Sequence, residues 1–275
     1  MGKKITISIT GRNDDHADNF ANRLCTSVKK NIMLLNSYLD YDFEYLITDW
    51  CSQGELLYQH KSIKNLLQEG GVKFIIVSPE KIREKFGHER FYQFFAKNVG
   101  IRHAQGEWVL NTNADNVFNK QLVIKLNEII ANDNDNEFYR TRWWMDVDSD
   151  MDIISIKDCD EGVHTSERGL APIYSGDFLL AKKTTLIEKS KGHDEVNLKH
   201  QTELAQVHMD GEILFNLRNN GVKSVILDNY IFHITHPRSS VYDYHYNRNG
   251  YENSDTWGFS ELSEKHISKN ITELV

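Results

Sequence analysis

Proline and cysteine are scarce in this sequence, with three residues of each among 275. Because so few prolines occur, and because no stretch is rich in proline, glycine or serine, the sequence predicts no linker between domains. We therefore expect one continuous domain. The cysteines, Cys25, Cys51 and Cys159, are odd in number and lack the spacing of a metal site. Reduced thiols are the simplest account of them, and they predict a cytoplasmic protein.

Long apolar runs and an excess of positive charge are absent as well. No run of about 18 apolar residues occurs, so we expect no transmembrane segment, and the first residues lack the apolar region of a signal peptide. The formal net charge is −8, which argues against a nucleic-acid partner because such a partner needs a basic face. A single nucleotide is not excluded, since a bound metal ion can supply positive charge.

The sequence does contain a regular alternation of strand-like and helix-like patterns. The expected strands lie at residues 4–10, 43–48, 72–77, 108–110, 138–145, 175–181 and 224–234. The expected helices lie at residues 18–36, 55–68, 88–104, 120–132, 183–190 and 208–219, and an irregular surface segment is expected at 146–172. This alternation predicts an α/β domain with a doubly wound, mostly parallel central sheet and helices on both faces.

The stretch from Phe95 to Phe118 carries the clearest chemical signal. Its pattern predicts a helix, a turn at Gly106 and a short buried strand, after which polar residues follow at once, among them Asn113 and Asp115. Open α/β sheets bind ligands at the carboxyl ends of their strands, and carboxylate and amide oxygens suit hard divalent cations. The alternative is an ordinary turn in which asparagine and aspartate cap the next helix.

Several short motifs, taken in order, resemble those of the GT-A glycosyltransferases, especially the family 2-like enzymes that use nucleotide sugars. The strongest is the K-N-x-G-I-x-x-A-x-G-E block at residues 97–107, followed by N-A-D at 113–115 in the metal-binding D-x-D position. The others are T-G-R-N-D-D-H at 10–16, G-D-F at 176–178, G-H-D-E at 192–195, H-M-D-G-E at 208–212 and F-H-I-T-H-P at 232–237. The resemblance covers about residues 4–238.

This resemblance implies a single GT-A domain, Rossmann-like and doubly wound, at residues 1–238, with residues 239–275 as a C-terminal tail and candidate lid. It also implies transfer of a sugar, in the manner of hexosyltransferases, from a nucleoside-diphosphate sugar to a hydroxyl of a glycan, lipid or protein acceptor. Uridine diphosphate is the expected nucleotide, Mn²⁺ or Mg²⁺ the expected cofactor, and inversion the expected stereochemistry. No nucleic acid is expected as a partner.

The same resemblance assigns roles to individual residues. The metal ligands are expected to be Asp115, Asn113, His233 and His236. The nucleotide and its diphosphate are expected to contact Thr10, Arg12, Asn13, Asp49, Lys97 and Asn113. Asp210 is the expected general base and Glu212 the alternative, while Asp177 or Asp194 would hold the acceptor.

Each of these assignments has a plainer alternative. His233 fits equally well as a half-buried strand histidine, Asp210 as a charge that complements a helix dipole, and Lys97 as a solvated helix lysine. Asn113 stands where aspartate is usual, and its amide brings no charge to a metal. A non-catalytic nucleotide- or glycan-binding module therefore remains an alternative. A sugar nucleotidyltransferase is another, although the sequence lacks the glycine-rich phosphate loop it would need.

Overall fold

The computed structural model describes residues 4–13, 19–52, 54–69, 71–87, 89, 91–158, 178–195, 209–236 and 252–275. Their strands are β1 (Lys4–Gly11), β2 (Asp42–Trp50), β3 (Val72–Val77), β4 (Trp108–Thr112), β5 (Asn116–Val117), β6 (Glu137–Val147), β7 (Ile153–Asp158), β8 (Phe178–Lys182), β9 (Lys223–Ile234), β10 (Glu264–Ser268) and β11 (Ile271–Leu274). The helices are α1 (Phe20–Tyr38), α2 (Lys61–Glu69), α3 (Pro79–Phe86), α4 (Gln93–His103), α5 (Lys120–Asn132), α6 (Lys183–Thr185) and α7 (Met209–Asn219). Short helical turns are η1 (Leu57–Gln59), η3 (Leu186–Ser190) and η6 (Trp257–Phe259).

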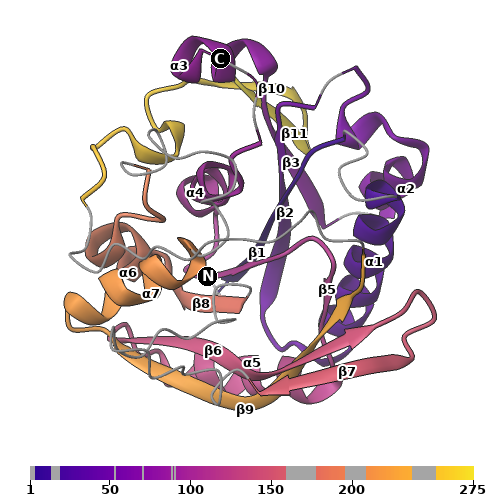
Figure 1. The fold of residues 1–275 in the computed structure, drawn as a ribbon, viewed down its shortest axis with the longest axis vertical. Coiled ribbons are helices and arrows are strands. Elements are labelled where there is room, and N and C mark those ends of the chain that lie inside the picture. Colours follow the sequence, from indigo (N-terminus) through magenta and orange to yellow (C-terminus); the bar gives the residue numbers. More distant parts are fainter. Residues whose placement is uncertain are drawn as a thin grey trace.

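These strands form one mixed sheet in the order β10-β11-β3-β2-β1-β4-β8-β6-β9-β5, with β7 added beside β6 (Figure 1). The block from β11 to β4 is parallel throughout. Beyond β4 the sheet continues through the antiparallel strand β8, and β6 and β9 pair in parallel. The predicted α/β fold with a mostly parallel central sheet is confirmed.

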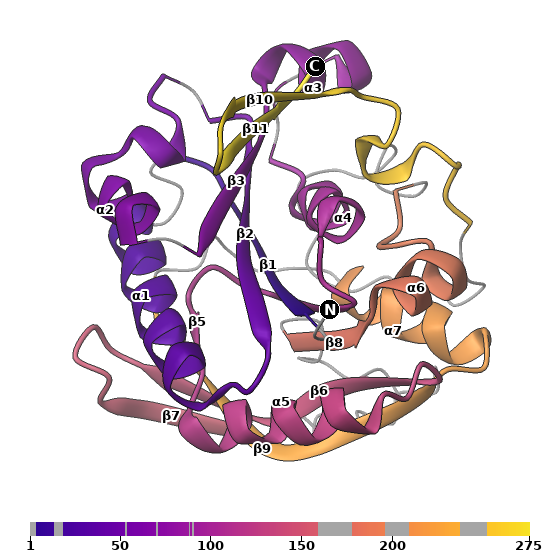
Figure 2. The same ribbon diagram turned by 180° about the vertical axis from the view of Figure 1, so that it is seen from behind.

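Helices cover both faces of the parallel block: α1 and α2 lie on one side of β1, β2 and β3, and α4 lies on the other (Figure 1 and Figure 2). Alternating side chains along a strand point to opposite faces. In β2, Tyr45 and Ile47 accordingly join the core beneath α1, whereas Leu46 joins the core beneath α4. Burial on both faces explains the nearly apolar sequence of β3, whereas β1 alternates isoleucine with threonine and serine although both of its faces are buried.

The C-terminal residues extend the sheet, which the sequence analysis did not predict. Strand β11 pairs in parallel with β3, and β10 pairs with β11 as an antiparallel strand at the edge. Residues 252–275 of the tail therefore include part of the fold. The domain boundary at residue 238 and the lid role of residues 239–275 remain predictions, and residues 237–251 lie outside the described part of the chain.

Within the described ranges, no helix combines the length and the apolar character needed to cross a membrane. Cys25 and Cys51 are buried free thiols. The cytoplasmic location remains a prediction.

Two glycines of the K-N-x-G-I-x-x-A-x-G-E block mark close approaches to β1. A Cβ atom at Gly106 would lie 2.5 Å from the backbone nitrogen of Thr6, whereas a Cβ at Gly100 would collide with the side-chain hydroxyl of Ser8. Glycine therefore lets the helix α4 and the following turn pack directly on β1, which places β4 and the polar residues after it.

We expect Gly106→Ala to destabilise the protein by about 1–3 kcal/mol, because overpacking against backbone cannot be relieved by a rotamer change. Gly100→Ala should also destabilise, but the double variant Gly100→Ala/Ser8→Ala should recover most of the loss, since it removes the colliding hydroxyl. Urea unfolding measures the difference. Equal recovery of Gly106→Ala by Thr6→Ala would contradict the assignment, because that substitution leaves the backbone nitrogen in place.

Candidate metal centre and its pocket

Strand pairing brings the residues after β4 to the end of β9. The turn after β4 leads into β5, which pairs with β9 so that Asn116 lies opposite His233. The backbone nitrogen of Ile234 donates a hydrogen bond to the carbonyl of Asp115 at 3.0 Å. Two segments more than a hundred residues apart in sequence are thereby held side by side, and His236 follows β9 by two residues.

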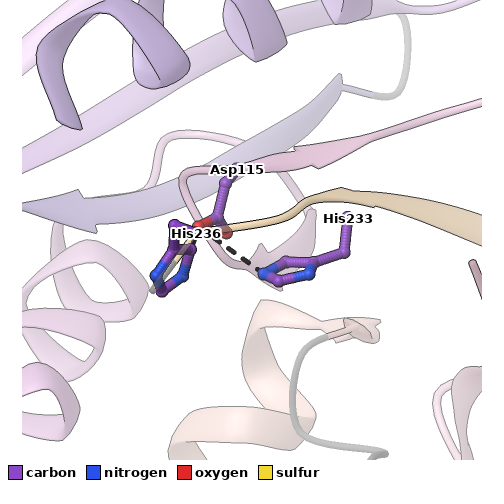
Figure 3. A group of neighbouring side chains, drawn as sticks. All are labelled: Asp115, His233 and His236. Atoms are coloured by element: carbon purple, nitrogen blue, oxygen red, sulfur yellow. Dashed lines mark ion pairs between the residues drawn. The ribbon is translucent and has the colours of Figure 1, made fainter. Parts of the chain in front are cut away.

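This pairing gathers Asp115, His233 and His236, three of the four predicted metal ligands, into one cluster. Oδ2 of Asp115 lies 3.7 Å from Nε2 of His233 and 3.2 Å from Nε2 of His236. Figure 3 shows both imidazole rings beside the Asp115 carboxylate. One potential ligand atom from each residue lies within 4.8 Å of the others.

The cluster has the chemistry and the spacing of a divalent metal site. Imidazole nitrogens bind transition metals at about 2.0–2.1 Å, so two ligand atoms on one ion lie roughly 3–3.5 Å apart. The Asp115–His236 and Asp115–His233 distances are close to this spacing. The residues present therefore fit a divalent metal ion.

Burial and charge set the ionisation of the cluster. Burial acts to raise the pKa of Asp115, but the hydrogen bond from His236 and the nearby charges of His233 and His236 outweigh it and lower that pKa. Burial lowers the pKa of His233 despite its acidic neighbours. An ionised carboxylate and a neutral imidazole result, and these are the forms that coordinate metals.

Asp146 lies behind His233, and the sequence analysis did not single it out. Its Oδ1 is 3.0 Å from Nδ1 of His233 and accepts a hydrogen bond from Nε1 of Trp144 at 2.9 Å. Its Oδ2 accepts a hydrogen bond from Oγ of Ser155 at 2.8 Å. The expected irregular segment at 146–172 is wrong in its first part, because β6 extends to Val147 and β7 pairs with it as a hairpin.

The cluster forms one wall of a pocket with a volume of about 200 Å³. Predicted site residues that line it are Thr10, Arg12, Asn113, Asp115, His233 and His236. Lining residues that the sequence analysis did not single out are Phe20, Arg23, Phe91 and Gln93. The pocket therefore combines a candidate metal site, two arginines and two aromatic rings.

Hydrogen bonds and ring contacts with neighbouring residues hold two of the polar side chains that line the pocket, Arg12 and Asn113. Nη1 of Arg12 donates to the carbonyl of Glu89 at 3.0 Å, and its guanidinium lies 5.7 Å from the ring centre of Phe91. Nε2 of Gln93 donates to Oδ1 of Asn113 at 3.1 Å. Asn113 lines the same pocket as the cluster, and its role as a further metal ligand remains a prediction.

Other predicted nucleotide contacts do not line this pocket. Asp49 is fully buried, and its carboxylate accepts hydrogen bonds from Ser52 Oγ and, at 2.8 Å, from the Leu57 nitrogen. Asn13 donates through its backbone nitrogen to Ser52 Oγ at 2.8 Å. Lys97 is completely buried, with Nζ 5.5 Å from the ring centre of Phe94, so the alternative of a solvated lysine is wrong. The nucleotide roles of all three remain predictions.

The structure describes only some of the candidate residues for acid–base catalysis and acceptor binding. Asp210 and Glu212 belong to the first turn of α7, but their side chains lie outside the described part of the structure. Asp177 lies outside it altogether, whereas Asp194 is buried. Their roles remain predictions.

The buried carboxyl of Asp49 should make the stability of the folded protein depend on pH. Burial raises its pKa from 3.8 to about 6, although hydrogen bonds from Ser52 and Leu57 oppose the shift. The folded protein binds this proton more tightly than the unfolded chain does. The protonated carboxyl therefore stabilises the fold fully below pH 4, and this stabilisation, up to about 3 kcal/mol, is lost as the pH rises through 6.

Asp49→Asn imitates the protonated carboxyl, so its free energy of unfolding relative to the wild type should increase between pH 4 and pH 7. Urea unfolding at the two pH values measures this. Asp42→Asn, at an exposed position that begins the same strand, is the control and should show no such change. A relative stability of Asp49→Asn that does not vary with pH would contradict the buried, proton-binding carboxyl.

Comparison with known proteins identifies the fold. No protein-family model matches the sequence, and no curated protein matches it at a significant level. Among solved structures, residues 1–349 of TarS from S. aureus align with a TM-score of 0.56 at 14% identity, over 84% of this chain and 60% of that one. The same protein in complex with UDP gives 0.55 at 13% identity over 84% and 60%, and in complex with UDP-GlcNAc 0.55 at 13% over 87% and 60%.

The chain thus spans about 60% of the length of the TarS 1–349 structures that it matches. At 13–14% identity the likeness concerns the fold. The GT-A fold that the sequence motifs implied is confirmed.

Proposed function

We propose that this GT-A fold chain is a glycosyltransferase that moves a sugar from a nucleoside-diphosphate sugar to a hydroxyl acceptor, with inversion. The observation that carries the proposal is the Asp115–His233–His236 cluster in the wall of a pocket that also presents Arg12 and Arg23. UDP is the proposed nucleotide, which is supported by the TarS structures with UDP and UDP-GlcNAc.

The cluster would hold a divalent cation through Asp115, His233 and His236. Such an ion supplies positive charge that stabilises the departing nucleoside diphosphate. We propose Mn²⁺ rather than Mg²⁺, because two of the three ligand atoms are imidazole nitrogens and Mg²⁺ prefers oxygen ligands.

The remaining pocket residues would hold the donor. Arg12 and Arg23 place guanidinium groups at the pocket wall, and guanidinium groups bind phosphate oxygens through paired hydrogen bonds. Phe20 and Phe91 supply apolar surface on which a nucleobase or a sugar ring can pack. Asn13 and Asp49 would act on the nucleotide through the loop that they hold, which includes Ser52.

The chain's own contribution to the reaction is proton removal from the acceptor hydroxyl. We propose Asp210 for this role, with Glu212 as the alternative, because both lie in the first turn of α7. A carboxylate within hydrogen-bond reach of the attacking hydroxyl accepts its proton as the bond to the sugar forms. The acceptor itself would be a glycan, a lipid or a protein.

A non-catalytic nucleotide-binding module on the same fold is the second candidate. The observation that favours it is Asn113, a neutral side chain beside the cluster where the related motif has a carboxylate. Release of UDP from UDP-sugars in the presence of Mn²⁺ separates the two, since a binding module leaves the donor intact.

A thermal-shift panel tests the proposed donor class. A ligand that binds only the native state stabilises it by mass action, by about 2.7 kcal/mol at a concentration 100 times its Kd. This stabilisation raises the melting temperature. UDP and UDP-sugars should raise the melting temperature more with Mn²⁺ than with EDTA. A panel in which no nucleoside diphosphate or nucleotide sugar stabilises the protein, with either addition, would contradict the proposal.

A further inference from the structure

We infer that Asp146 is a positioning residue that fixes His233 for metal binding, so that the protein's own side chains capture a transition-metal ion before any nucleotide arrives. The inference rests on the metal site of the proposed function and goes beyond it in two respects. It assigns a role to a residue outside the ligand set, and it predicts when the metal binds and which metals are preferred.

Strand register places Asp146 and His233 together. In the parallel pairing of β6 with β9, Asp146 is the register partner of His233, and Asn116 of β5 is its partner on the other side. Facing side chains of paired strands lie within contact distance. His233 therefore has Asp146 on one side and the Asp115 turn on the other.

The Asp146 carboxylate is itself held in place. It is buried, and both of its oxygens are engaged, Oδ1 by Trp144 and His233 and Oδ2 by Ser155. The indole of Trp144 also lies against the His233 ring, with 4.8 Å between ring centres. Contacts from β6 and β7 thus fix both the acceptor atom and the plane of the imidazole.

This arrangement selects one tautomer of His233. A neutral imidazole carries a single N–H, and donating it from Nδ1 to a carboxylate leaves the lone pair on Nε2 free to coordinate. Nε2 of His233 is the atom that lies 3.7 Å from Oδ2 of Asp115. A carboxylate that orients a histidine in this way is a recurrent partner of metal ligands.

The resulting ligand set is complete enough to bind metal without a substrate. Mg²⁺ sites commonly rely on one or two carboxylates together with substrate phosphates. Here the protein supplies one carboxylate oxygen and two imidazole nitrogens within 4.8 Å of one another. Imidazole favours transition metals over Mg²⁺ and Ca²⁺, so Co²⁺ or Mn²⁺ alone should bind and Mg²⁺ alone should bind far more weakly.

Titration of the nucleotide-free protein with Co²⁺, followed by visible absorption, tests the inference. The wild type should bind one Co²⁺ per chain, and Asp146→Ala should weaken the affinity about 10–100-fold. Asp146→Asn retains an acceptor oxygen and should fall between the two. Asp150→Asn, which makes the same charge change in the exposed turn between β6 and β7, should bind like the wild type.

The tautomer of His233, read from its ¹⁵N chemical shifts, distinguishes a positioning role of Asp146 from a purely structural role. The wild type should carry the proton on Nδ1, and folded Asp146→Ala should lose this preference. If Asp146→Ala does not fold, Asp146→Asn decides: an affinity equal to that of the wild type overturns the inference. So does a wild type that binds Mg²⁺ and Co²⁺ equally, or that binds no Co²⁺ without nucleotide.

Failure here is distinguishable from failure of the proposed function. A protein that binds UDP with added Mn²⁺ but no metal alone overturns the inference and leaves the proposed function standing. A protein that binds Co²⁺ through the cluster but binds no nucleoside diphosphate and no nucleotide sugar supports the inference and overturns the proposed function.

Discussion

Asp115→Ala should abolish the metal dependence of donor binding. Asp115 is the carboxylate that lies within 3.7 Å of both histidine side chains, and it brings the negative charge of the cluster. Its removal leaves two imidazoles to hold a divalent cation, so the ion should no longer be retained. Calorimetric titration with UDP should show an affinity that depends on Mn²⁺ in the wild type and an affinity that does not depend on Mn²⁺ in the variant.

Asn113→Asp is the matched control for this result. The substitution keeps an oxygen next to the cluster and adds a charge, so Mn²⁺-dependent donor binding should be preserved or strengthened. An Asp115→Ala variant that binds the donor with the metal dependence of the wild type would contradict the assignment of the metal centre. Loss of binding in Asn113→Asp would place Asn113 in a different role from metal coordination.

Asp210→Asn should lower turnover by about 10²–10⁴-fold, the usual contribution of a general base. Asparagine keeps the size and much of the hydrogen bonding of aspartate but cannot accept the proton. Donor affinity should stay nearly intact, because the base meets the acceptor and not the nucleotide. Steady-state UDP release in the presence of acceptor, combined with calorimetric titration of UDP, measures both quantities.

Glu212→Gln is the companion variant and should have the milder effect. The choice of Asp210 comes from counting back along α7 from Gly221, whose positive φ of 81° marks the turn after the helix. The two residues are separated by Gly211 in the first turn of α7. A larger effect of Glu212→Gln would assign the base to Glu212, and wild-type turnover in both variants would remove this turn of α7 from proton transfer.

The fold could be predicted well where local pattern and tertiary packing agree. The helix expected at 120–132 has those bounds as α5, because Asn119 caps it through the Leu122 nitrogen and its apolar residues form one buried face. The C-terminal strands could not be predicted in this way. β11 spans only Ile271–Leu274, and its strand character depends on pairing with β3, some two hundred residues earlier in the chain.

The expected helix at 88–104 shows a different failure. The structure has α4 from Gln93 only, and a separate helix, α3, begins at Pro79 after the cap Ser78. Ser-Pro is a recognisable helix start, and the αL residue Gly87 ends the helix. These local signals were present in the sequence, whereas the prediction began the helix at residue 88, five residues before the start of α4.

The same distinction between local pattern and tertiary contact applies to the residues of the candidate site. Asp115, His233 and His236 stand in short motifs that could be compared with a known family, and the structure places them together. Asp146, Arg23 and Gln93 reach the site through tertiary contacts. Asp146 meets His233 only because β6 pairs in parallel with β9 in one register, and no local pattern at Asp146 reports that pairing.

The most direct test of the proposed metal-assisted donor site is a crystal structure with Mn²⁺ and UDP, with anomalous scattering used to locate the metal. The account predicts one strong anomalous peak in contact with Asp115, His233 and His236, at about 2.0–2.2 Å from their ligand atoms. It also predicts a UDP diphosphate beside this ion, within reach of Arg12 and Arg23. A peak elsewhere, or UDP bound away from this pocket, would contradict it.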